Sequence, residues 1–183
     1  TFESLEPVLK MIKENEPELW SKATRFYECA DWLIYKLTGK YTASINCASA
    51  RWYYNSEEGG YPVDFYDKIG LEDLIDKLPP QVLPMGECVG GLTAQAAQDL
   101  GLKEGTPVGE GGADAFVGVI GLNAVQPGKL VLITGSSHLH IAQVKKAVHT
   151  KGIWGSYPDC IVSGLQMVEG GQTSTGSIIE WFV

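Results

Sequence analysis

The chain has 183 residues, of which 44% are apolar and 20% charged, a composition typical of a folded globular protein that excludes intrinsic disorder. Lys and Arg number 14 against 22 Asp and Glu, and this net charge of −8 argues against a broad nucleic-acid surface or an anionic membrane face. A local phosphate site is still compatible with it. No apolar run reaches the length that a bilayer crossing needs.

The four cysteines are far apart in the sequence and form no CxxC pair: Cys29, Cys47, Cys88 and Cys160. This spacing excludes a zinc finger and a dense disulfide framework. We therefore expect buried, reduced thiols and a cytoplasmic protein.

The first third of the chain has helical spacing. Residues 5–15 and 17–39 predict two helices, the second with Pro17 in its first turn and Gly39 at its C-terminal end. Residues 41–54 are rich in small, β-branched and aromatic side chains, which predicts an extended or mixed segment.

The middle of the chain predicts two further helices. One covers roughly residues 63–78 and ends at Pro79 and Pro80, and the other is "TAQAAQDLGL", which ends at Gly101.

The pattern changes after residue 105. Residues 106–121, "TPVGEGGADAFVGVIG", predict a short strand, a glycine-rich junction and a helix. Residues 128–144 alternate as two strands around a tight "TGSS" turn. The seam between two domains is expected at residues 123–128, which gives domains of 1–124 and 125–183.

The two ends of the sequence predict a fragment of a longer protein. The chain has no initiator Met and no signal peptide, and it stops at "TGSIIEWFV", within an expected apolar helix.

Asp114 is the first candidate for chemistry. It follows Gly111 and Gly112, between the expected strand and the expected helix. Its carboxylate can therefore accept hydrogen bonds from N–H groups of the first helical turn while one oxygen faces a crevice. That position suits a general base. The alternative is an N-terminal helix cap that serves stability alone.

The turn "TGSSHLH" is the second candidate. Gly135 permits close approach, and Ser136 and Ser137 can donate hydrogen bonds to phosphate oxygens; the alternative is an ordinary hairpin turn. His138 and His140 share a strand face, but without a third ligand they predict packing rather than a metal site.

The third candidate is "EGGQTSTG". Glu169 can accept hydrogen bonds from sugar hydroxyls, while the N–H groups of Gly170, Gly171 and Gln172 can face a ligand. The alternative is again a helix cap.

These motifs together resemble the FGGY carbohydrate kinases, most closely their ribulokinase-like branch. The resemblance is carried, in chain order, by "ADWLIYKLTGKYTASINCASARWYY", "GLEDLIDKLPPQVLPMGECVGGLTAQAAQDLGLKEGTPV", "GEGGADAFVGVIG", "LVLITGSSHLHIA", "KGIWGSYPD" and "EGGQTSTG". It implies an α/β, actin-like ATPase (RNase H-like) fold. The chain would cover the later, sugar-binding part of the first domain and the beginning of the second, nucleotide-binding domain.

The resemblance also implies roles for particular residues. Asp114 becomes the catalytic base of an ATP-dependent kinase for a ketopentose such as ribulose, or a related polyol. Arg51 and Glu169 become sugar ligands. Gly135, Ser136, Ser137 and Gly171 become the phosphate-contacting residues. The implied cofactors are ATP and Mg²⁺, with no metal cage made by the protein, and the implied partners are the sugar and ATP; a homodimer is a further possibility.

The chain departs from the family pattern at three positions. It has Phe116 where relatives often carry His, and Ser136 where they often carry Thr. Relatives also often carry Trp near the position of Gln166. The change at Ser136 keeps the hydroxyl, whereas the other two alter the pocket and leave the sugar open.

The family's N-terminal phosphate loop and its C-terminal adenosine site are both absent from the sequence. We therefore expect residues 1–183 alone not to turn over ATP. Two other classes remain: a kinase-like module that binds sugar or scaffolds a partner without transferring phosphate, and an actin-like chaperone or filament protein.

Overall fold

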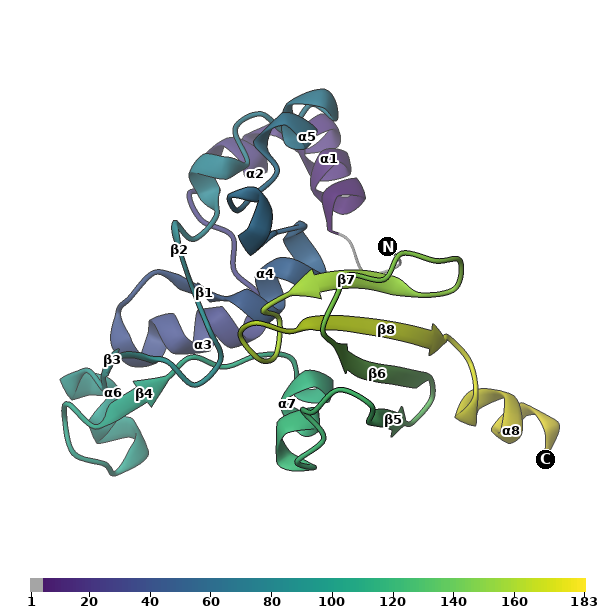
Figure 1. Ribbon diagram of the computed structural model, residues 1–183. Coiled ribbons are helices and arrows are strands. Elements are labelled where there is room, and N and C mark those ends of the chain that lie inside the picture. Colours follow the sequence, from purple (N-terminus) through teal and green to yellow (C-terminus); the bar gives the residue numbers. More distant parts are fainter. Residues whose placement is uncertain (1–4) are drawn as a thin grey trace. The chain divides into compact units, whose positions relative to one another are not determined.

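The computed structural model describes residues 5–183, which form two compact units divided between residues 112 and 113 (Figure 1). The first unit is mainly helical and has two small sheets. Its helices are α1 (Glu6–Asn15), α2 (Pro17–Lys22), α3 (Cys29–Thr38), α4 (Ile45–Trp52), α5 (Val63–Lys68) and α6 (Ala94–Leu100), with 3-10 turns at Ser56–Glu58 and Ile75–Lys77. Its strands are β1 (Thr42–Ser44), parallel to β2 (Gln81–Leu83), and β3 (Cys88–Gly91), antiparallel to β4 (Pro107–Gly109).

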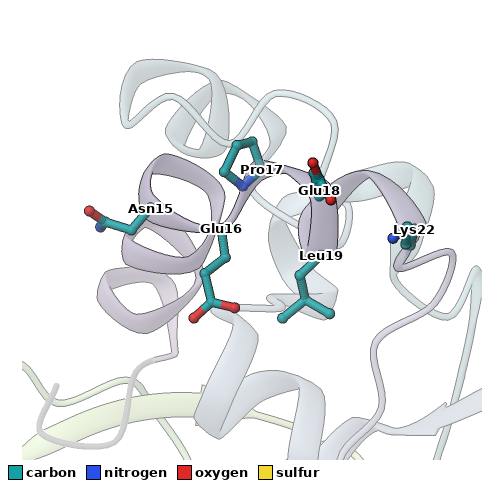
Figure 2. A pocket seen from close by; sticks show the side chains of 6 residues that line it. All are labelled: Asn15, Glu16, Pro17, Glu18, Leu19 and Lys22. Carbon is teal, nitrogen blue, oxygen red and sulfur yellow. The ribbon is translucent and has the colours of Figure 1, made fainter.

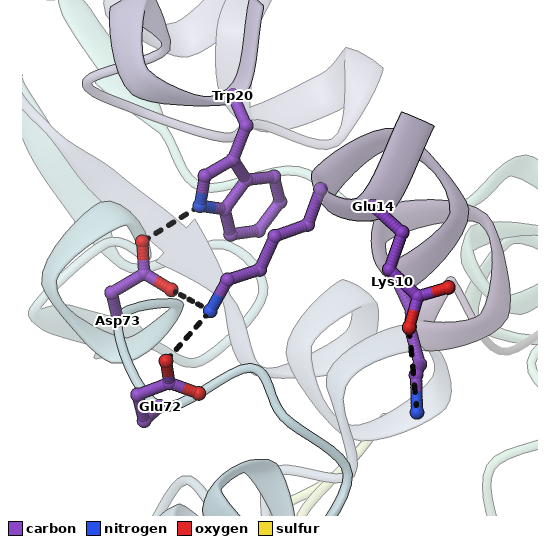
Figure 3. A network of polar contacts seen from close by, with 6 residues as sticks. Lys10, Glu14, Trp20, Glu72 and Asp73 are labelled. Atoms are coloured by element: carbon purple, nitrogen blue, oxygen red, sulfur yellow. Dashed lines mark hydrogen bonds and ion pairs between the residues drawn. The ribbon is translucent and has the colours of Figure 1, made fainter. Parts of the chain in front are cut away.

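A cluster of large apolar side chains forms the main core of the first unit. Its buried members are Leu9, Trp20, Trp52, Tyr66, Leu71, Leu74 and Leu78. At its edge, Asp73 joins the helices to the segment that follows α5: its carboxylate accepts hydrogen bonds from Trp20 Nε1 at 2.7 Å and from Lys13 Nζ at 2.7 Å (Figure 3). Helices α1 and α2 therefore contact this core through hydrogen bonds to Asp73 as well as through apolar side chains.

The expectation of one helix over residues 17–39 is wrong in its middle. Helix α2 ends at Lys22 and α3 begins at Cys29. Between them, Phe26 N donates to the carbonyl oxygen of Lys77 at 2.8 Å, and the Phe26 ring packs 5.4 Å from that of Trp20. Contacts distant in sequence therefore override the helical spacing here. The predicted stop at Gly39 is confirmed, because Gly39 has a left-handed φ of 72°.

The segment 41–54 is mostly helical rather than extended. After the three residues of β1, the Ser44 hydroxyl accepts a hydrogen bond from Asn46 N at 3.3 Å and caps α4. The region 63–78 is only partly helical. The helix ending at Gly101 is confirmed, with Thr93 as its N-cap.

The second unit consists of helix α7 (Asp114–Gly121), a four-stranded antiparallel sheet and helix α8 (Gly176–Phe182). The strands β5 (Leu130–Thr134), β6 (His138–Val144), β7 (Trp154–Pro158) and β8 (Gln166–Gln172) lie in the order β5-β6-β8-β7 (Figure 1). Strands β5 and β6 form the predicted hairpin, in which Thr134 pairs with His138. Helix α7 belongs to the same compact unit as this sheet. The domain boundary at residues 123–128 stays a prediction.

The four cysteines are only partly as expected. None of them forms a disulfide, and Cys47 and Cys160 are buried, but Cys29 and Cys88 are exposed. Among residues 5–183, none of the helices combines the length and apolar character that a membrane crossing requires.

Candidate functional site

Asp114 is the first residue of α7. The preceding residue, Ala113, is extended, with φ −66° and ψ 142°, and occupies the cap position. The alternative interpretation of Asp114 as the N-cap is therefore wrong. Its Oδ1 accepts a hydrogen bond from Ala115 N at 2.7 Å, and the residue is exposed. A carboxylate held in this way at a helix N-terminus is accessible to a ligand.

Helix α7 covers the same face of the sheet that carries Glu169. A methyl group built on Gly118 of α7 would lie 3.9 Å from Cδ1 of Ile133. Ile133 pairs with Leu139, and Ile141, two residues further along β6, pairs with Glu169. Directly paired residues point to the same face of a sheet, and so do residues two apart on one strand. The side chains of Ile133, Leu139, Ile141 and Glu169 therefore lie on one face.

Glu169 is a buried strand residue. It lies in β8, between Ile141 of β6 and Trp154 of β7, and only 4% of it is exposed. The helix that follows begins seven residues later, at Gly176, so the helix-cap alternative is wrong. The local acid-Gly-Gly pattern could not reveal this, because the burial comes from strands on both sides.

The serine turn, residues 135–137, joins β5 and β6 and is exposed. Gly135 N donates to the Ser137 carbonyl oxygen at 2.9 Å, which closes the turn. The Ser136 carbonyl oxygen accepts from Thr175 N at 2.8 Å and from Ser177 Oγ at 3.2 Å. The start of α8 thus holds the carbonyl side of the turn, and the side chains of Ser136 and Ser137 are exposed.

Gly171 lies at the same end of the sheet as the serine turn. It pairs with Leu139, and its neighbour Gln172 pairs with His138, the residue that follows the turn. A methyl group on Gly171 would lie 2.9 Å from Cζ3 of Trp154, so the strand has no room for a side chain there. The structure therefore brings together the predicted phosphate-contacting residues.

Arg51 belongs to the first unit, where it is half-buried in the last turn of α4. All the other predicted site residues belong to the second unit. The position of Arg51 beside a sugar stays a prediction.

Two buried carboxylates of the first unit were missed by sequence reasoning. Asp31 is 1% exposed and accepts from Ser44 N at 2.9 Å; Glu110 is 4% exposed and accepts from Thr42 Oγ1 at 2.9 Å. Burial raises the pKa of Asp31 to about 7 and also raises the pKa of Glu110. The only signal in the sequence was an acidic residue within the apolar and glycine-rich run "PVGEGG".

The residues present fit a phosphate-bound Mg²⁺ better than a protein-made metal cage. Within residues 5–183, no group of three or more His, Cys, Asp or Glu is arranged to hold a metal ion. Mg²⁺ is commonly bound through one or two carboxylates plus substrate phosphates. The exposed Asp114 and the exposed serine turn match that requirement.

A depression of about 510 Å³ lies on the first unit, at the end of α1 and along α2 (Figure 2). Its lining includes Glu16, Glu18 and Lys22. None of the predicted site residues contributes to it, so it is a separate surface feature.

Comparisons with known proteins agree with the resemblance seen in the motifs. The N-terminal domain of the FGGY family of carbohydrate kinases matches residues 2–121. An FGGY carbohydrate kinase domain-containing protein of Danio rerio is 37% identical over 97% of the chain and 36% of its own length. A ribulokinase of Shouchella clausii is 36% identical over 94% of the chain and 31% of its own length. The chain thus spans about a third of these relatives.

Solved structures show the same fold. The xylulose kinase of Rhodospirillum rubrum superposes with a TM-score of 0.85 at 24% identity, over 99% of the chain and 36% of the kinase. The expected α/β, actin-like ATPase fold, present in part, is therefore confirmed. With two thirds of its length matched by the family's N-terminal domain, the chain belongs to the FGGY family of carbohydrate kinases.

Proposed function

We propose that this chain carries the sugar-binding and phosphate-facing part of an ATP-dependent sugar kinase that acts on a ketopentose such as ribulose. One observation carries the proposal: an exposed carboxylate, Asp114, begins the helix that covers the sheet face of Glu169. The same unit contains the serine turn at one end of that sheet. The ribulokinase relatives support the choice of substrate class.

Asp114 is the proposed general base. It takes the proton of the sugar hydroxyl as that oxygen attacks the γ-phosphorus of ATP, a P–O bond forms, and the bond to the bridging oxygen breaks to release ADP. Such a base has to be within hydrogen-bond reach of the hydroxyl and ionised at working pH. The exposed position of Asp114 in the first turn of α7 leaves its carboxylate open to such a hydroxyl.

The other site residues bind and orient. Glu169 accepts hydrogen bonds from sugar hydroxyls, and Arg51 is a second proposed sugar ligand. The serine turn and the backbone at Gly171 donate to phosphate oxygens, where the transferring group gathers negative charge. Mg²⁺, when bound, offsets the charge of the phosphates and orients them.

The identity of the sugar depends on residues that differ from the usual family pattern. Phe116 and Gln166 are both buried, 4% and 7% exposed, so they would influence sugar binding through packing rather than through contact with solvent. A ketopentose and a related polyol differ at one carbonyl group, so the choice between them is a matter of one or two hydrogen bonds.

A chimera tests this function. Residues 1–183 would replace the aligned segment of the Shouchella clausii ribulokinase, to which they are 36% identical. We expect ribulose-dependent ADP release, and we expect Asp114→Asn to lower kcat by about 10²-fold or more with little change in ribulose affinity. Asp114→Glu, which keeps the charge, is the matched control.

The result also separates the two classes. A folded chimera that binds ribulose but releases no ADP, with or without Asp114, would favour a sugar-binding module without phosphate transfer. Equal loss of binding and rate in Asp114→Asn would show that the aspartate is structural.

A further inference from the structure

Arg25 is an exposed arginine in the segment between α2 and α3. Residues 1–112 contain 18 of the 22 Asp and Glu residues of the chain. Even so, no carboxylate among residues 5–183 forms an ion pair with Arg25. The charge of this guanidinium is therefore not neutralised within the described part of the chain.

Tyrosine rings hold the Arg25 side chain in place. Its Cζ lies 4.7 Å from the centroid of the Tyr41 ring and 5.8 Å from that of Tyr35. The Tyr27 ring packs against both, with centroids 4.9 Å from Tyr41 and 5.4 Å from Tyr35. Because a cation–π contact uses the charge of a guanidinium and none of its hydrogen bonds, the N–H groups stay available to a ligand.

The tyrosine cluster is itself anchored to the backbone. The Tyr41 hydroxyl donates to the carbonyl oxygen of Lys77 and, at 3.4 Å, to that of Phe26. The Tyr27 hydroxyl lies beside Arg25 and raises the pKa of the guanidinium above its usual range. A guanidinium has five N–H donors, so one hydroxyl cannot occupy them all. Arg25 is thus a charged, oriented group with donors to spare.

A depression of about 590 Å³ opens beside Arg25. It is lined by Thr24, Arg25, Tyr27 and Tyr35, and its volume is within the range of small-molecule sites. This lining has one positive charge and no carboxylate. Thr24 is exposed and has a hydroxyl that can donate to an anion. None of the residues of the proposed kinase site contributes to the lining, so the depression is a separate place on the first unit.

The lining matches a phosphate group on a small sugar. Guanidinium groups bind phosphate oxygens through paired, charge-assisted N–H···O bonds, and the Thr24 hydroxyl adds a further donor. Tyrosine rings have an apolar body and a polar tip, which suits the C–H faces and the hydroxyls of a sugar. A polyanion such as nucleic acid fits poorly, because the chain has a net charge of −8 and the site presents a single arginine.

We propose that the depression at Arg25 binds the phosphate group of a small sugar monoester. Arg25 and Thr24 donate to the phosphate oxygens, and the rings of Tyr27 and Tyr35 pack against the sugar. Inorganic phosphate offers the same group without the sugar, and the experiment separates the two. The inference goes beyond the proposed kinase reaction and does not depend on it, since none of these residues takes part in that reaction.

The test titrates the whole chain with ribose 5-phosphate, inorganic phosphate and neutral ribose, and follows the arginine Nε–H signals by NMR. The sequence has two arginines, Arg25 and Arg51, so Arg25→Gln assigns both signals. We expect ribose 5-phosphate to shift the Arg25 signal saturably and neutral ribose to leave it unchanged. Equal affinity for inorganic phosphate and ribose 5-phosphate would overturn the role of the tyrosine rings and reduce the site to one for phosphate alone.

Variants at Arg25 measure its contribution. Arg25→Gln should weaken ribose 5-phosphate binding by about tenfold or more, the effect of losing a hydrogen bond from a charged group. Arg25→Lys, which keeps the charge and loses the paired donors, should fall between the two. The matched control is Lys22→Gln, which removes the same charge at the end of α2, outside this lining. It should change the affinity by less than about twofold, because salt screens exposed charges.

Three results would overturn the inference. The first is the absence of a saturable shift at Arg25, and the second is an equal loss of affinity in Lys22→Gln and Arg25→Gln, which would show a general charge effect. The third is a set of shifts confined to residues 135–137, which would place the phosphate at the proposed kinase site. The kinase proposal itself is judged separately, by ADP release in the chimera.

Discussion

Thr175 donates its backbone N–H to the carbonyl oxygen of Ser136 at 2.8 Å, so the start of α8 holds the serine turn although 39 residues separate the two. The Thr175 hydroxyl reinforces this contact, with Oγ1 at 3.3 Å from the same carbonyl oxygen. The turn that we assign to phosphate binding therefore depends on a helix outside its own hairpin.

Gly176→Ala should loosen the serine turn. A methyl group at this position would lie 2.6 Å from the carbonyl oxygen of Gly135, a distance that requires backbone to move. We expect a loss of about 1–3 kcal/mol in the free energy of unfolding, and faster hydrogen exchange at residues 135–137. Gly121→Ala is the control, because nothing lies within 4 Å of a methyl group there. Unchanged exchange in Gly176→Ala would contradict the bracing role of α8.

Asp31 should make the protein less stable as the pH rises. Burial, with Glu110 and Glu28 nearby, raises its pKa from 3.8 to about 7 in the folded chain. Between these values the folded state holds a proton that the unfolded state has released, so the free energy of unfolding falls with pH across this window. Each unit of the pKa difference corresponds to about 1.4 kcal/mol.

Asp31→Asn should remove this dependence and raise stability at pH 7–8, because the amide oxygen can still accept from Ser44 N. Urea denaturation from pH 4 to pH 8 measures the effect, with the exposed Asp67→Asn as the control. A wild-type chain whose stability is flat or rises across this range, after correction by the control, would refute the assignment.

Asp73→Ala should destabilise the first unit more than Glu72→Ala does. Asp73 binds both the buried indole N–H of Trp20 and the ammonium of Lys13, whereas Glu72 does not bind Trp20 and its side chain is 62% exposed (Figure 3). Loss of Asp73 leaves the indole unpaired, at a cost of about 1–3 kcal/mol. An exposed ion pair contributes about 0–1 kcal/mol. Equal urea midpoints of unfolding for Asp73→Ala and Glu72→Ala would show that the hydrogen bond from Trp20 to Asp73 adds nothing to stability.

Residues 1–183 alone should show no ribulose-dependent release of ADP. The chain spans about a third of its curated relatives, and the family's phosphate loop and adenosine site are not in its sequence. A coupled assay with ATP, Mg²⁺ and ribulose measures this, with the intact Shouchella clausii ribulokinase as the positive control. A rate typical of that kinase would disprove the expectation.

The elements that the sequence predicts well are those with local signals. The β5–β6 hairpin has two runs of strand-forming residues around a glycine-serine turn, and the helices that end at Gly39 and Gly101 have a residue suited to a left-handed stop. At residue 114, the break between an apolar strand and an apolar helix was also visible. In each case the information lies within a few neighbouring residues.

Helix α4 could not be predicted from periodicity. All but one of its eight residues are buried, so it lacks the polar face that makes a helix recognisable in sequence. The break at residues 23–28 depends on Phe26 and Lys77, which are 51 positions apart. The burial of Glu169 likewise arises from its two partner strands. Such features come from contacts distant along the chain.

Trp154 can serve as an intrinsic fluorescent probe of anion binding to this sheet. Its half-buried indole lies against Gly171, close enough that a methyl group there would be 2.9 Å from the ring. Indole emission responds to changes in polarity within a few ångströms, so an anion that settles on this strand would alter the fluorescence. Four other tryptophans contribute to the signal, and replacing Trp154 by Phe would isolate its share.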